Sequence, residues 1–304
     1  MEIQNILILG SGTMGHQIGL LCAAHGYEVV LYDIQAEMMD AARKRVEAGA
    51  ARMAAKGIIQ EQDKTDILNR MAYTTDPHRA AENADLLSES VPEDPLLKGK
   101  VLGQFNELCP ETTLFTSNTS SLIPSMFAEA SGRPDRLCAL HFHDVFLSNI
   151  VDVMPHPGTS PETLDTVKTF AESIGQIPIL LHKEHNGYVF NNMLMVLLES
   201  ALTLAEKDVA SIEDIDRSWM GVMHTDAGPF GTMDAIGLDT VYKITDYWAK
   251  VRNDEQAKRN AAFLKEYIEQ GHTGRKSGRG FYTYPDPAFR EPDWIRSKTS
   301  IRPG

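Results

Sequence analysis

The chain is poor in cysteine and carries no obvious set of metal ligands. It has three cysteines in 304 residues, and their odd number and wide spacing predict neither a disulfide framework nor a zinc site. Cys22, Cys109 and Cys138 each lie among apolar residues, which favours small buried side chains. We therefore expect no bound metal and a reducing, cytoplasmic setting.

Long apolar runs and positive charge are also scarce. No run reaches the length of about 18 residues that a membrane span needs, and the first residues lack the basic region and cleavage site of a signal peptide. The chain has 29 Lys and Arg residues and 42 Asp and Glu residues, which gives a net charge of -13. This balance argues against general binding to nucleic acid and, more weakly, to anionic membranes. A local pocket for an anionic small molecule remains open.

The rest of the composition is that of an ordinary globular protein, with 42% hydrophobic and 23% charged residues and no internal repeat. At roughly 150 residues per domain, the length predicts two domains. In the first half, short apolar runs alternate with segments of helix-forming residues. Strands are predicted at residues 6–9, 29–32, 86–87, 114–115 and 137–140, and helices at 14–25, 37–55 and 63–71. This alternation predicts a mostly parallel, doubly wound sheet with helices on both faces.

The second half has a different pattern. After a last apolar run at 177–181, helical patterns cover residues 188–207, 211–220, 233–250 and 255–270. The second of these helices has a clear start signal, because Ser211 is followed three residues later by Asp214, as in a capping box. We expect an α/β domain over 1–184, an all-helical domain over 185–284 and an irregular, proline-containing tail over 285–304.

A glycine-rich motif follows the first predicted strand. Residues 10–15 read Gly-Ser-Gly-Thr-Met-Gly, which is G-x-G-x-x-G at the start of a helix. Gly10 suits a tight turn, Gly12 lets the backbone approach a pyrophosphate, and Gly15 lets the helix pack closely on the strand. Together with Thr13 and Met14, these residues are typical of a Rossmann-type domain that holds a dinucleotide at a helix N-terminus. The alternative is a glycine-rich turn without a ligand.

An acidic residue at the end of the second predicted strand indicates which dinucleotide is bound. Asp33 lies 18 residues beyond Gly15, where a carboxylate can accept hydrogen bonds from the ribose hydroxyls of NAD. The same carboxylate would repel a 2′-phosphate, and no arginine follows it immediately. These observations favour NAD over NADP, with FAD as the competitor that shares the motif.

Several further motifs occur in a recognisable order. The run Ser-Asn-Thr-Ser-Ser-Leu at 117–122 and the run Gly-Arg-Lys-Ser-Gly-Arg-Gly-Phe-Tyr at 274–282 are specific, and His141 follows another predicted strand. Over residues 3–284 the chain resembles the L-3-hydroxyacyl-CoA dehydrogenase family. The resemblance implies an NAD-binding Rossmann domain, a helical domain that dimerises, and oxidation of a 3-hydroxyacyl thioester to the 3-ketoacyl form.

The resemblance also implies catalytic residues. His141 matches the histidine that takes the proton of the substrate hydroxyl, a role suited to an imidazole. Asp152 falls where the family has a glutamate paired to that histidine. Aspartate is one methylene shorter than glutamate, and the segment that joins His141 to Asp152 is one residue shorter than the family leads us to expect. These two changes either compensate each other or break the pair. Ser120 matches the serine that hydrogen-bonds to the substrate oxygen, and Asn191 matches an active-site asparagine, with a helix N-cap as its alternative.

Other positions match ligand contacts of the family. Glu93, Lys98 and Lys276 correspond to coenzyme contacts, Asp144 replaces an asparagine near the nicotinamide, and Lys56 corresponds to a position that can meet the CoA nucleotide. Three of these residues have a simpler alternative. Glu93 fits an acidic helix N-terminus, and Lys98 and Lys56 fit exposed helix lysines.

The sequence departs from the family close to the expected substrate. His143 replaces an aromatic residue and is expected at most to support His141. Asp144 adds a charge near the nicotinamide, and Asn192 replaces an arginine that could anchor an anionic substrate. The segment 151–157 resembles the gulonate dehydrogenase branch, which does not use CoA. The alternatives are therefore an NAD-dependent dehydrogenase of a free hydroxy acid and, more remotely, an inactive NADH-binding protein. By analogy with the family, we expect a homodimer.

Overall fold

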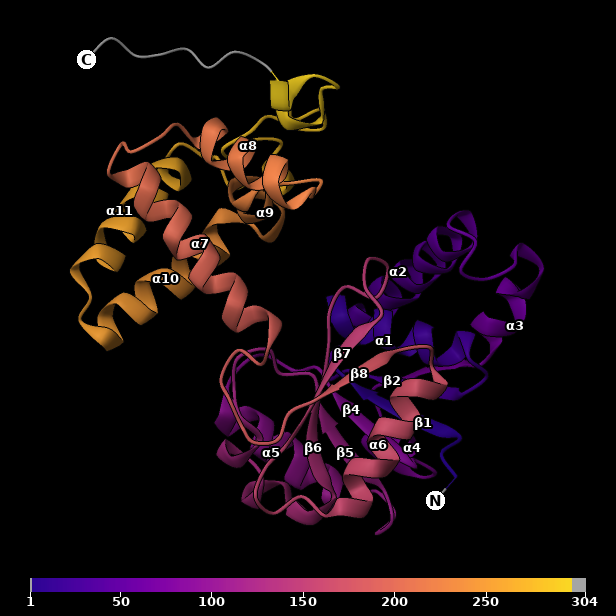
Figure 1. The fold of residues 1–304 in the computed structure, drawn as a ribbon. Coiled ribbons are helices and arrows are strands. Elements are labelled where there is room, and N and C mark those ends of the chain that lie inside the picture. Colours follow the sequence, from indigo (N-terminus) through magenta and orange to yellow (C-terminus); the bar gives the residue numbers. More distant parts are fainter. Residues whose placement is uncertain (1, 297–304) are drawn as a thin grey trace. The chain divides into compact units, whose positions relative to one another are not determined.

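The structure, a computed structural model, describes residues 2–296 and divides into two compact units (Figure 1). One unit ends at Phe190 and the other begins at Asn191. The N-terminal unit holds an eight-stranded sheet in the order β3-β2-β1-β4-β5-β6-β7-β8. The strands are β1 (Asn5–Leu9), β2 (Glu28–Tyr32), β3 (Met71–Thr74), β4 (Leu86–Glu89), β5 (Leu114–Ser117), β6 (Leu137–Phe142), β7 (Ile150–Pro155) and β8 (Ile177–Leu180).

The sheet is parallel from β1 to β6, β7 runs antiparallel to β6, and β8 runs parallel to β7. The helices of this unit are α1 (Thr13–Ala24), α2 (Ala36–Ala55), α3 (Lys64–Asn69), α4 (Pro77–Ala81), α5 (Pro95–Asn106) and α6 (Pro161–Ser173). Because strand side chains alternate, Ile6 and Ile8 pack with α1, α2 and α6, whereas Leu7 and Leu9 pack with α4 and α5. The predicted doubly wound sheet, mostly parallel with helices on both faces, is confirmed.

Two segments of this unit differ from the sequence prediction. The helix predicted over 63–71 ends at Asn69, and Met71 instead begins the edge strand β3. That strand has four residues and buries only Met71, so no alternating pattern marks it. The segment at 150–155, where no strand was predicted, forms β7. The chain reverses after β6, which sets β7 antiparallel to it.

The second unit is helical, as predicted. Its helices are α7 (Phe190–Glu206), α8 (Ile212–Met223), α9 (Pro229–Ile236), α10 (Leu238–Arg252) and α11 (Glu255–Glu269). The predicted cap of α8 is confirmed, because Ser211 Oγ accepts a hydrogen bond of 3.1 Å from the amide of Asp214. The single helix predicted over 233–250 is wrong. Gly237 adopts a φ of 100° between α9 and α10, a backbone conformation that a helix cannot include.

The segment after Tyr284 is less irregular than expected. Short 3₁₀ turns form at Ala288–Arg290 and Trp294–Arg296, and Phe289 and Trp294 are buried in the core of the helical unit. The rest of the predicted tail, 297–304, lies outside the described residues. Within residues 2–296, no helix has the length and apolar character needed to cross a bilayer.

Candidate active site

The glycine-rich turn joins β1 to α1 and has the geometry that a dinucleotide site needs. Gly10 has a φ of 95°, and a Cβ there would lie 2.6 Å from the carbonyl oxygen of Ser90. A Cβ on Gly15 would overlap the carbonyl oxygen of Gly10, so α1 can pack this closely only on glycine. A Cβ on Gly12 would meet nothing within 4 Å. Gly12 is also the N-cap of α1 and offers no side-chain cap, so the first amides of the helix are available to an anion.

Asp33 follows directly after β2 and lies against this turn. Its Oδ2 accepts hydrogen bonds from the amide (2.9 Å) and hydroxyl (2.8 Å) of Ser11. Its Oδ1 accepts only a long hydrogen bond, of 3.4 Å, from the amide of Gln35. One carboxylate oxygen therefore braces the turn while the other is weakly engaged, and these residues fit the ribose and pyrophosphate of NAD. Arg45 of α2, which the sequence analysis did not single out, lies 3.4 Å from the carbonyl oxygen of Ser11.

His141 and Asp152 form a buried pair. The antiparallel register sets His141 of β6 directly opposite Asp152 of β7. Nδ1 of His141 lies 3.0 Å from Oδ2 of Asp152, and the two residues are 4% and 1% exposed. A carboxylate only accepts, so Nδ1 carries the hydrogen and donates it, which leaves Nε2 as the free ring nitrogen. The shorter acid therefore reaches the histidine in this register.

The Asp152 carboxylate also meets a second imidazole. Nε2 of His143 lies 3.5 Å from the same Oδ2, a longer polar contact than that of His141. Burial acts to raise the pKa of Asp152, but hydrogen bonding and charge attraction from the two histidines outweigh it and hold the pKa below its usual range. Asp152 thus stays ionised despite its burial.

An aromatic ring covers one face of the His141 imidazole. Tyr188 stacks on it, with ring centroids 4.7 Å apart and an interplanar angle of 23°, and His143 approaches edge-on at 4.8 Å. Tyr188 is 2% exposed, and its hydroxyl donates a hydrogen bond of 2.7 Å to the carbonyl oxygen of Thr119. Tyr188 begins the helix predicted over 188–207, and the sequence indicated no role for its side chain.

The loop after β5 carries Ser120, and one carboxylate organises it. Oε1 of Glu93 accepts hydrogen bonds from the amide of Ser120 (3.0 Å), the amide and hydroxyl of Ser121 (both 2.9 Å), and the hydroxyl of Thr119 (2.5 Å). Burial acts to raise the pKa of Glu93, but these donors and Lys98 lower it below its usual range. Ser120 itself is exposed on the surface of this loop.

Lys98 lies at the centre of a buried charge cluster. Its Nζ lies 2.8 Å from Glu89, 3.2 Å from Glu93 and 3.2 Å from the carbonyl oxygen of Val91. The side chain is 1% exposed, and three partners match the three hydrogens of an ammonium group. The alternative of an exposed helix lysine is wrong. In this geometry the buried Lys98 supports Glu93, which is 36% exposed and holds the Ser120 loop from the surface.

The loop between β6 and β7 is attached to α2. Oδ1 of Asp144 accepts a hydrogen bond of 2.9 Å from the amide of Phe146, which shapes the turn, and Nζ of Lys56 donates 2.7 Å to the carbonyl oxygen of Phe146. The guanidinium of Arg52 lies over the Phe146 ring at 4.6 Å. Asp144 and Lys56, expected near the nicotinamide and CoA, thus have structural partners in the loop.

Two expected site residues belong to the helical unit. Asn191 is half-buried in the first turn of α7, which begins at Phe190, so Asn191 is not the N-cap. Lys276 is exposed, and its Nζ lies 2.6 Å from Oδ1 of Asp239. The N-terminal unit by itself brings together His141, Asp152, His143 and the Ser120 loop.

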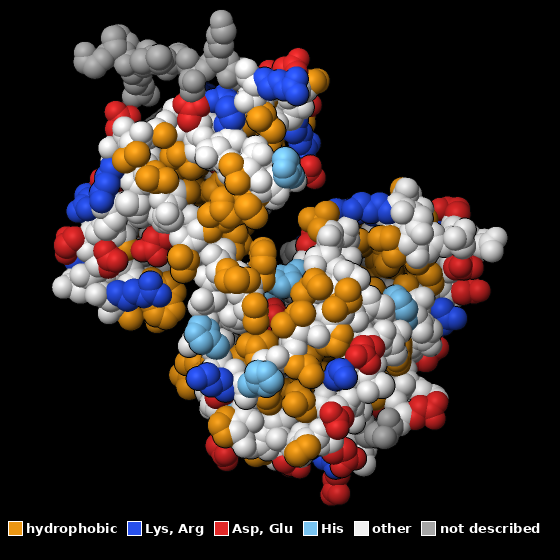
Figure 2. Space-filling model, in the orientation of Figure 1, with side chains coloured by type: hydrophobic (Ala, Val, Ile, Leu, Met, Phe, Trp, Pro, Cys, Tyr) orange, Lys and Arg blue, Asp and Glu red, His pale blue; other side chains and the backbone are white. Residues whose placement is uncertain are grey.

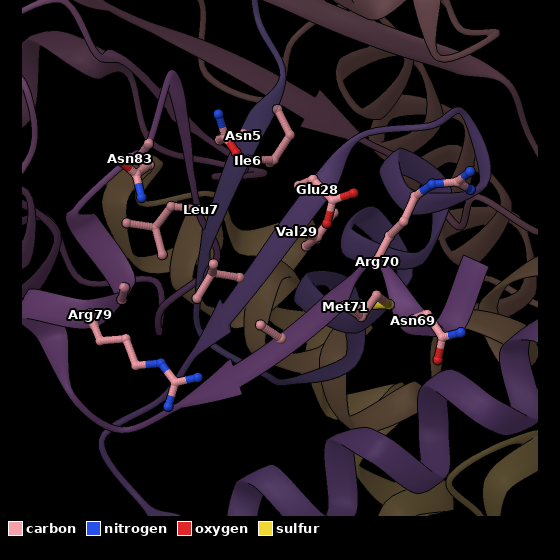
Figure 3. A pocket seen from close by; sticks show the side chains of 14 residues that line it. Asn5, Ile6, Leu7, Glu28, Val29, Asn69, Arg70, Met71, Arg79 and Asn83 are labelled. Carbon is pink, nitrogen blue, oxygen red and sulfur yellow. The ribbon is translucent and has the colours of Figure 1, made fainter. Parts of the chain in front are cut away.

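A hollow of about 170 Å³ lies elsewhere in the N-terminal unit (Figure 3). Asn5, Glu28 and Met71 line it, and these residues begin β1, β2 and β3. In a parallel sheet the starts of the strands lie at the edge opposite their carboxyl ends, where Gly10 and Asp33 are found. The hollow is therefore not part of the dinucleotide site.

The fold and this site define an NAD-binding oxidoreductase, and comparison with known proteins gives its family. The NAD-binding domain of 3-hydroxyacyl-CoA dehydrogenase matches residues 5–185, and the C-terminal domain of the same enzyme matches residues 187–284. The chain is 32% identical to a probable 3-hydroxybutyryl-CoA dehydrogenase of Bacillus subtilis, over 94% of this chain and 99% of that protein. It is 31% identical to the mitochondrial hydroxyacyl-coenzyme A dehydrogenase of Rattus norvegicus, over 93% and 91%.

Solved structures agree in fold. A diketoreductase, described as acting on dicarbonyl compounds, matches with a TM-score of 0.87 and 38% identity, over 93% of this chain and all of that one. The (S)-3-hydroxybutyryl-CoA dehydrogenase PaaH1 of Ralstonia eutropha matches with a TM-score of 0.84 and 29% identity, over 94% and 100%. The chain belongs to the 3-hydroxyacyl-CoA dehydrogenase family of NAD-dependent oxidoreductases.

Proposed function

We propose that this chain transfers a hydride between NAD and carbon 3 of a short 3-hydroxyacyl or 3-ketoacyl group carried by CoA. The observation that carries the proposal is the buried pair of His141 and Asp152, with a 3.0 Å contact, in a chain of this family. A base held by an ionised carboxylate is what proton exchange with a secondary alcohol requires.

Different residues of this chain would bind the coenzyme, transfer the proton and contact the substrate oxygen. The turn at Gly10 to Gly15 and the carboxylate of Asp33 would hold the coenzyme, whose nicotinamide supplies the hydride acceptor or donor when bound. Nε2 of His141 takes the proton of the substrate hydroxyl, and Asp152 stabilises the imidazolium that forms. In the reverse direction His141 returns this proton to the carbonyl oxygen. The hydroxyl of Ser120 hydrogen-bonds to that same oxygen, and Asn191 is proposed as a further polar contact.

A second candidate is a dehydrogenase of free dicarbonyl compounds or hydroxy acids. It is favoured by the 38% identity to a diketoreductase, which exceeds the identity to the CoA-dependent relatives named above. It is also favoured by Asn192, which supplies no cation for an anionic substrate, and by Lys56, whose Nζ bonds to the carbonyl of Phe146. Fewer free cations suit a smaller, less charged substrate than CoA.

One assay separates the two candidates. The purified chain is given NADH with acetoacetyl-CoA or with free acetoacetate, and loss of NADH absorbance is followed; a panel of free hydroxy acids is tested with NAD in the oxidative direction. Turnover of the thioester alone supports the first candidate. Turnover of free compounds alone, with no competition by free CoA, supports the second. Tight NADH binding without turnover of any of these compounds overturns both.

We also propose that the chain forms a homodimer through its helical unit. On α7, Met193 and Val196 are 61% and 64% exposed, and on α10 Tyr247 and Val251 are 60% and 57% exposed. Apolar side chains gather on the face of the helical unit that Figure 2 shows, and patches of this kind mark interaction surfaces. Sedimentation equilibrium should give twice the 33.7 kDa chain mass. A Met193→Lys, Val196→Lys variant should give the mass of one chain, and a monomeric wild type contradicts the proposal.

A further inference from the structure

Tyr188 occupies an unusual place in the N-terminal unit. It lies between β8 and α7, with a φ of 53° directly after Gly187, whose φ is 77°. A side chain larger than glycine is uncommon in this left-handed region, and such positions cluster where geometry is held for a purpose. The ring is 2% exposed and packs in a small buried cluster with Ala139, Met154 and Leu181.

The side chain makes two contacts, and each leads to a different part of the site. Its ring lies nearly parallel to the His141 imidazole at 4.7 Å, and its hydroxyl donates 2.7 Å to the carbonyl oxygen of Thr119. Thr119 immediately precedes Ser120. One buried residue therefore joins the proposed base to the loop that carries the proposed substrate-binding hydroxyl.

The other contacts of the His141 imidazole and of the Ser120 loop leave a role for Tyr188. Asp152 holds His141 through Nδ1 alone, and a single hydrogen bond does not prevent the imidazole from tilting about it. Glu93 holds the loop through the amides of Ser120 and Ser121 and the hydroxyl of Thr119. The Tyr188 ring limits the tilt, and its hydroxyl adds a bond on the carbonyl side of the loop. Burial raises the pKa of Tyr188 far above its usual range, so the hydroxyl remains a donor.

We propose that Tyr188 is a positioning residue that fixes the plane of the His141 imidazole and its separation from Ser120. Catalytic groups must be held within about 0.5 Å of their productive geometry, and a displacement of about 1 Å can cost about 100-fold in rate. The ring and the hydroxyl have separable tasks, because the ring acts on the base and the hydroxyl acts on the loop. The kinetic part of this inference rests on the proposed function.

Two substitutions separate these tasks. Tyr188→Leu removes the aromatic face, and we expect kcat to fall by about 10- to 100-fold while the Kd of NADH stays within about twofold. Tyr188→Phe keeps the ring and removes only the bond to Thr119, so most of the rate should be retained. The matched control is Phe170→Leu, another buried aromatic residue of the same unit, which contacts Tyr27. It should lower the melting temperature as much as Tyr188→Leu and leave kcat within about twofold.

A spectroscopic readout keeps the test independent of the substrate. In protein with labelled histidine, the His141 ring signals, assigned by their loss in His141→Asn, should carry the ring-current shift of a stacked aromatic. Tyr188→Leu should remove that shift, and Tyr188→Phe should keep it. If wild type turns over no substrate, the proposed function fails while these signals still test Tyr188. Unchanged His141 signals in Tyr188→Leu, or an equal loss of kcat in Phe170→Leu, would overturn the role of Tyr188.

Discussion

Two buried carboxylates, one in each unit, have pKa values that are shifted in opposite directions. Asp152 is 1% exposed and Asp216 is 0% exposed, and burial by itself raises the pKa of both. For Asp152, hydrogen bonds and charge attraction from His141 and His143 outweigh burial and hold the pKa below its usual range. For Asp216 burial wins, and the pKa rises to about 6.

The partners explain the difference. Asp216 of α8 accepts hydrogen bonds from the amides of Phe230 (2.8 Å) and Gly231 (2.9 Å) and from the hydroxyl of Tyr282 (3.1 Å), and the charge of Asp234 raises its pKa further. These neutral donors tie α8 to the start of α9 and to the segment after α11. The neutral donors around Asp216 hold it in place but do not offset its burial, whereas the two histidines beside Asp152 do offset the burial of that carboxylate. The comparison thus separates a carboxylate suited to chemistry from one suited to structure.

The largest expected effect comes from removing the base beside Asp152. His141→Asn should lower kcat by about 100-fold or more, the usual scale for a general base, and should leave the Kd of NADH nearly unchanged. Steady-state kinetics and NADH fluorescence measure the two quantities. The control is His25→Asn, an exposed histidine at the end of α1. Near-normal turnover in His141→Asn would remove the proposed mechanism.

The second prediction concerns Asp216 and the sign of its pH dependence. Its pKa is 3.8 in the unfolded chain and about 6 in the folded one, so the folded state binds the proton more tightly. The stabilisation is complete below about pH 4 and is lost as the pH rises through about 6, a change on the order of 3 kcal/mol for the full shift. The helical unit should therefore become less stable towards neutral pH.

Tryptophan fluorescence can isolate this effect. All three tryptophans, Trp219, Trp248 and Trp294, lie in the helical unit. The urea midpoint that they report should fall between about pH 4 and pH 7 in wild type and fall much less in Asp216→Asn. Asp152 lies in the other unit, and its lowered pKa acts with the opposite sign, below about pH 4. Equal slopes in wild type and Asp216→Asn would contradict the assignment.

The third prediction tests the fit of the shorter acid. Asp152 is opposite His141 in the strand register and already reaches it at 3.0 Å, so an added methylene must crowd a site that is 1% exposed. Asp152→Glu should lower kcat by about 10-fold, and Asp165→Glu on the exposed face of α6 should not change it. A faster Asp152→Glu enzyme would show that the aspartate limits the pair.

Much of the dinucleotide site was predictable because it is encoded locally. The glycine-rich turn and Asp33 lie at the ends of two strands whose patterns are continuous in sequence, and a parallel sheet brings those ends together. The contact of Asp152 with His141 was not predictable from residues alone. It depends on β7 running antiparallel to β6, and no local pattern records strand direction. The family resemblance named the pair but left open whether the shorter side chain would reach.

Lys98 shows a second limit. A lysine in a helical pattern is usually exposed, and only the fold shows that Glu89 and Glu93 enclose it. In the sequence, the one signal of this burial was the presence of two acids, nine and five residues before Lys98. Gly237 shows the opposite case. A glycine inside a helical pattern is often tolerated, so the sequence predicted one continuous helix over 233–250. The φ of 100° at Gly237 is instead set by the turn between α9 and α10.

The smallest expected effect concerns Asp216, the carboxylate with a structural role in this comparison. Tyr282→Phe removes the hydroxyl that lies 3.1 Å from Oδ2 of Asp216. A lost hydrogen bond of this kind costs about 1 kcal/mol. Because that bond lowers the pKa of Asp216, its loss should raise the pKa further and move the pH-dependent fall in stability to higher pH. The same fluorescence measurement applies, with Tyr247→Phe, 60% exposed, as the control. A fall at unchanged or lower pH would mean that the amides of Phe230 and Gly231 alone set the charge state of Asp216, and the comparison with Asp152 would then rest on backbone donors.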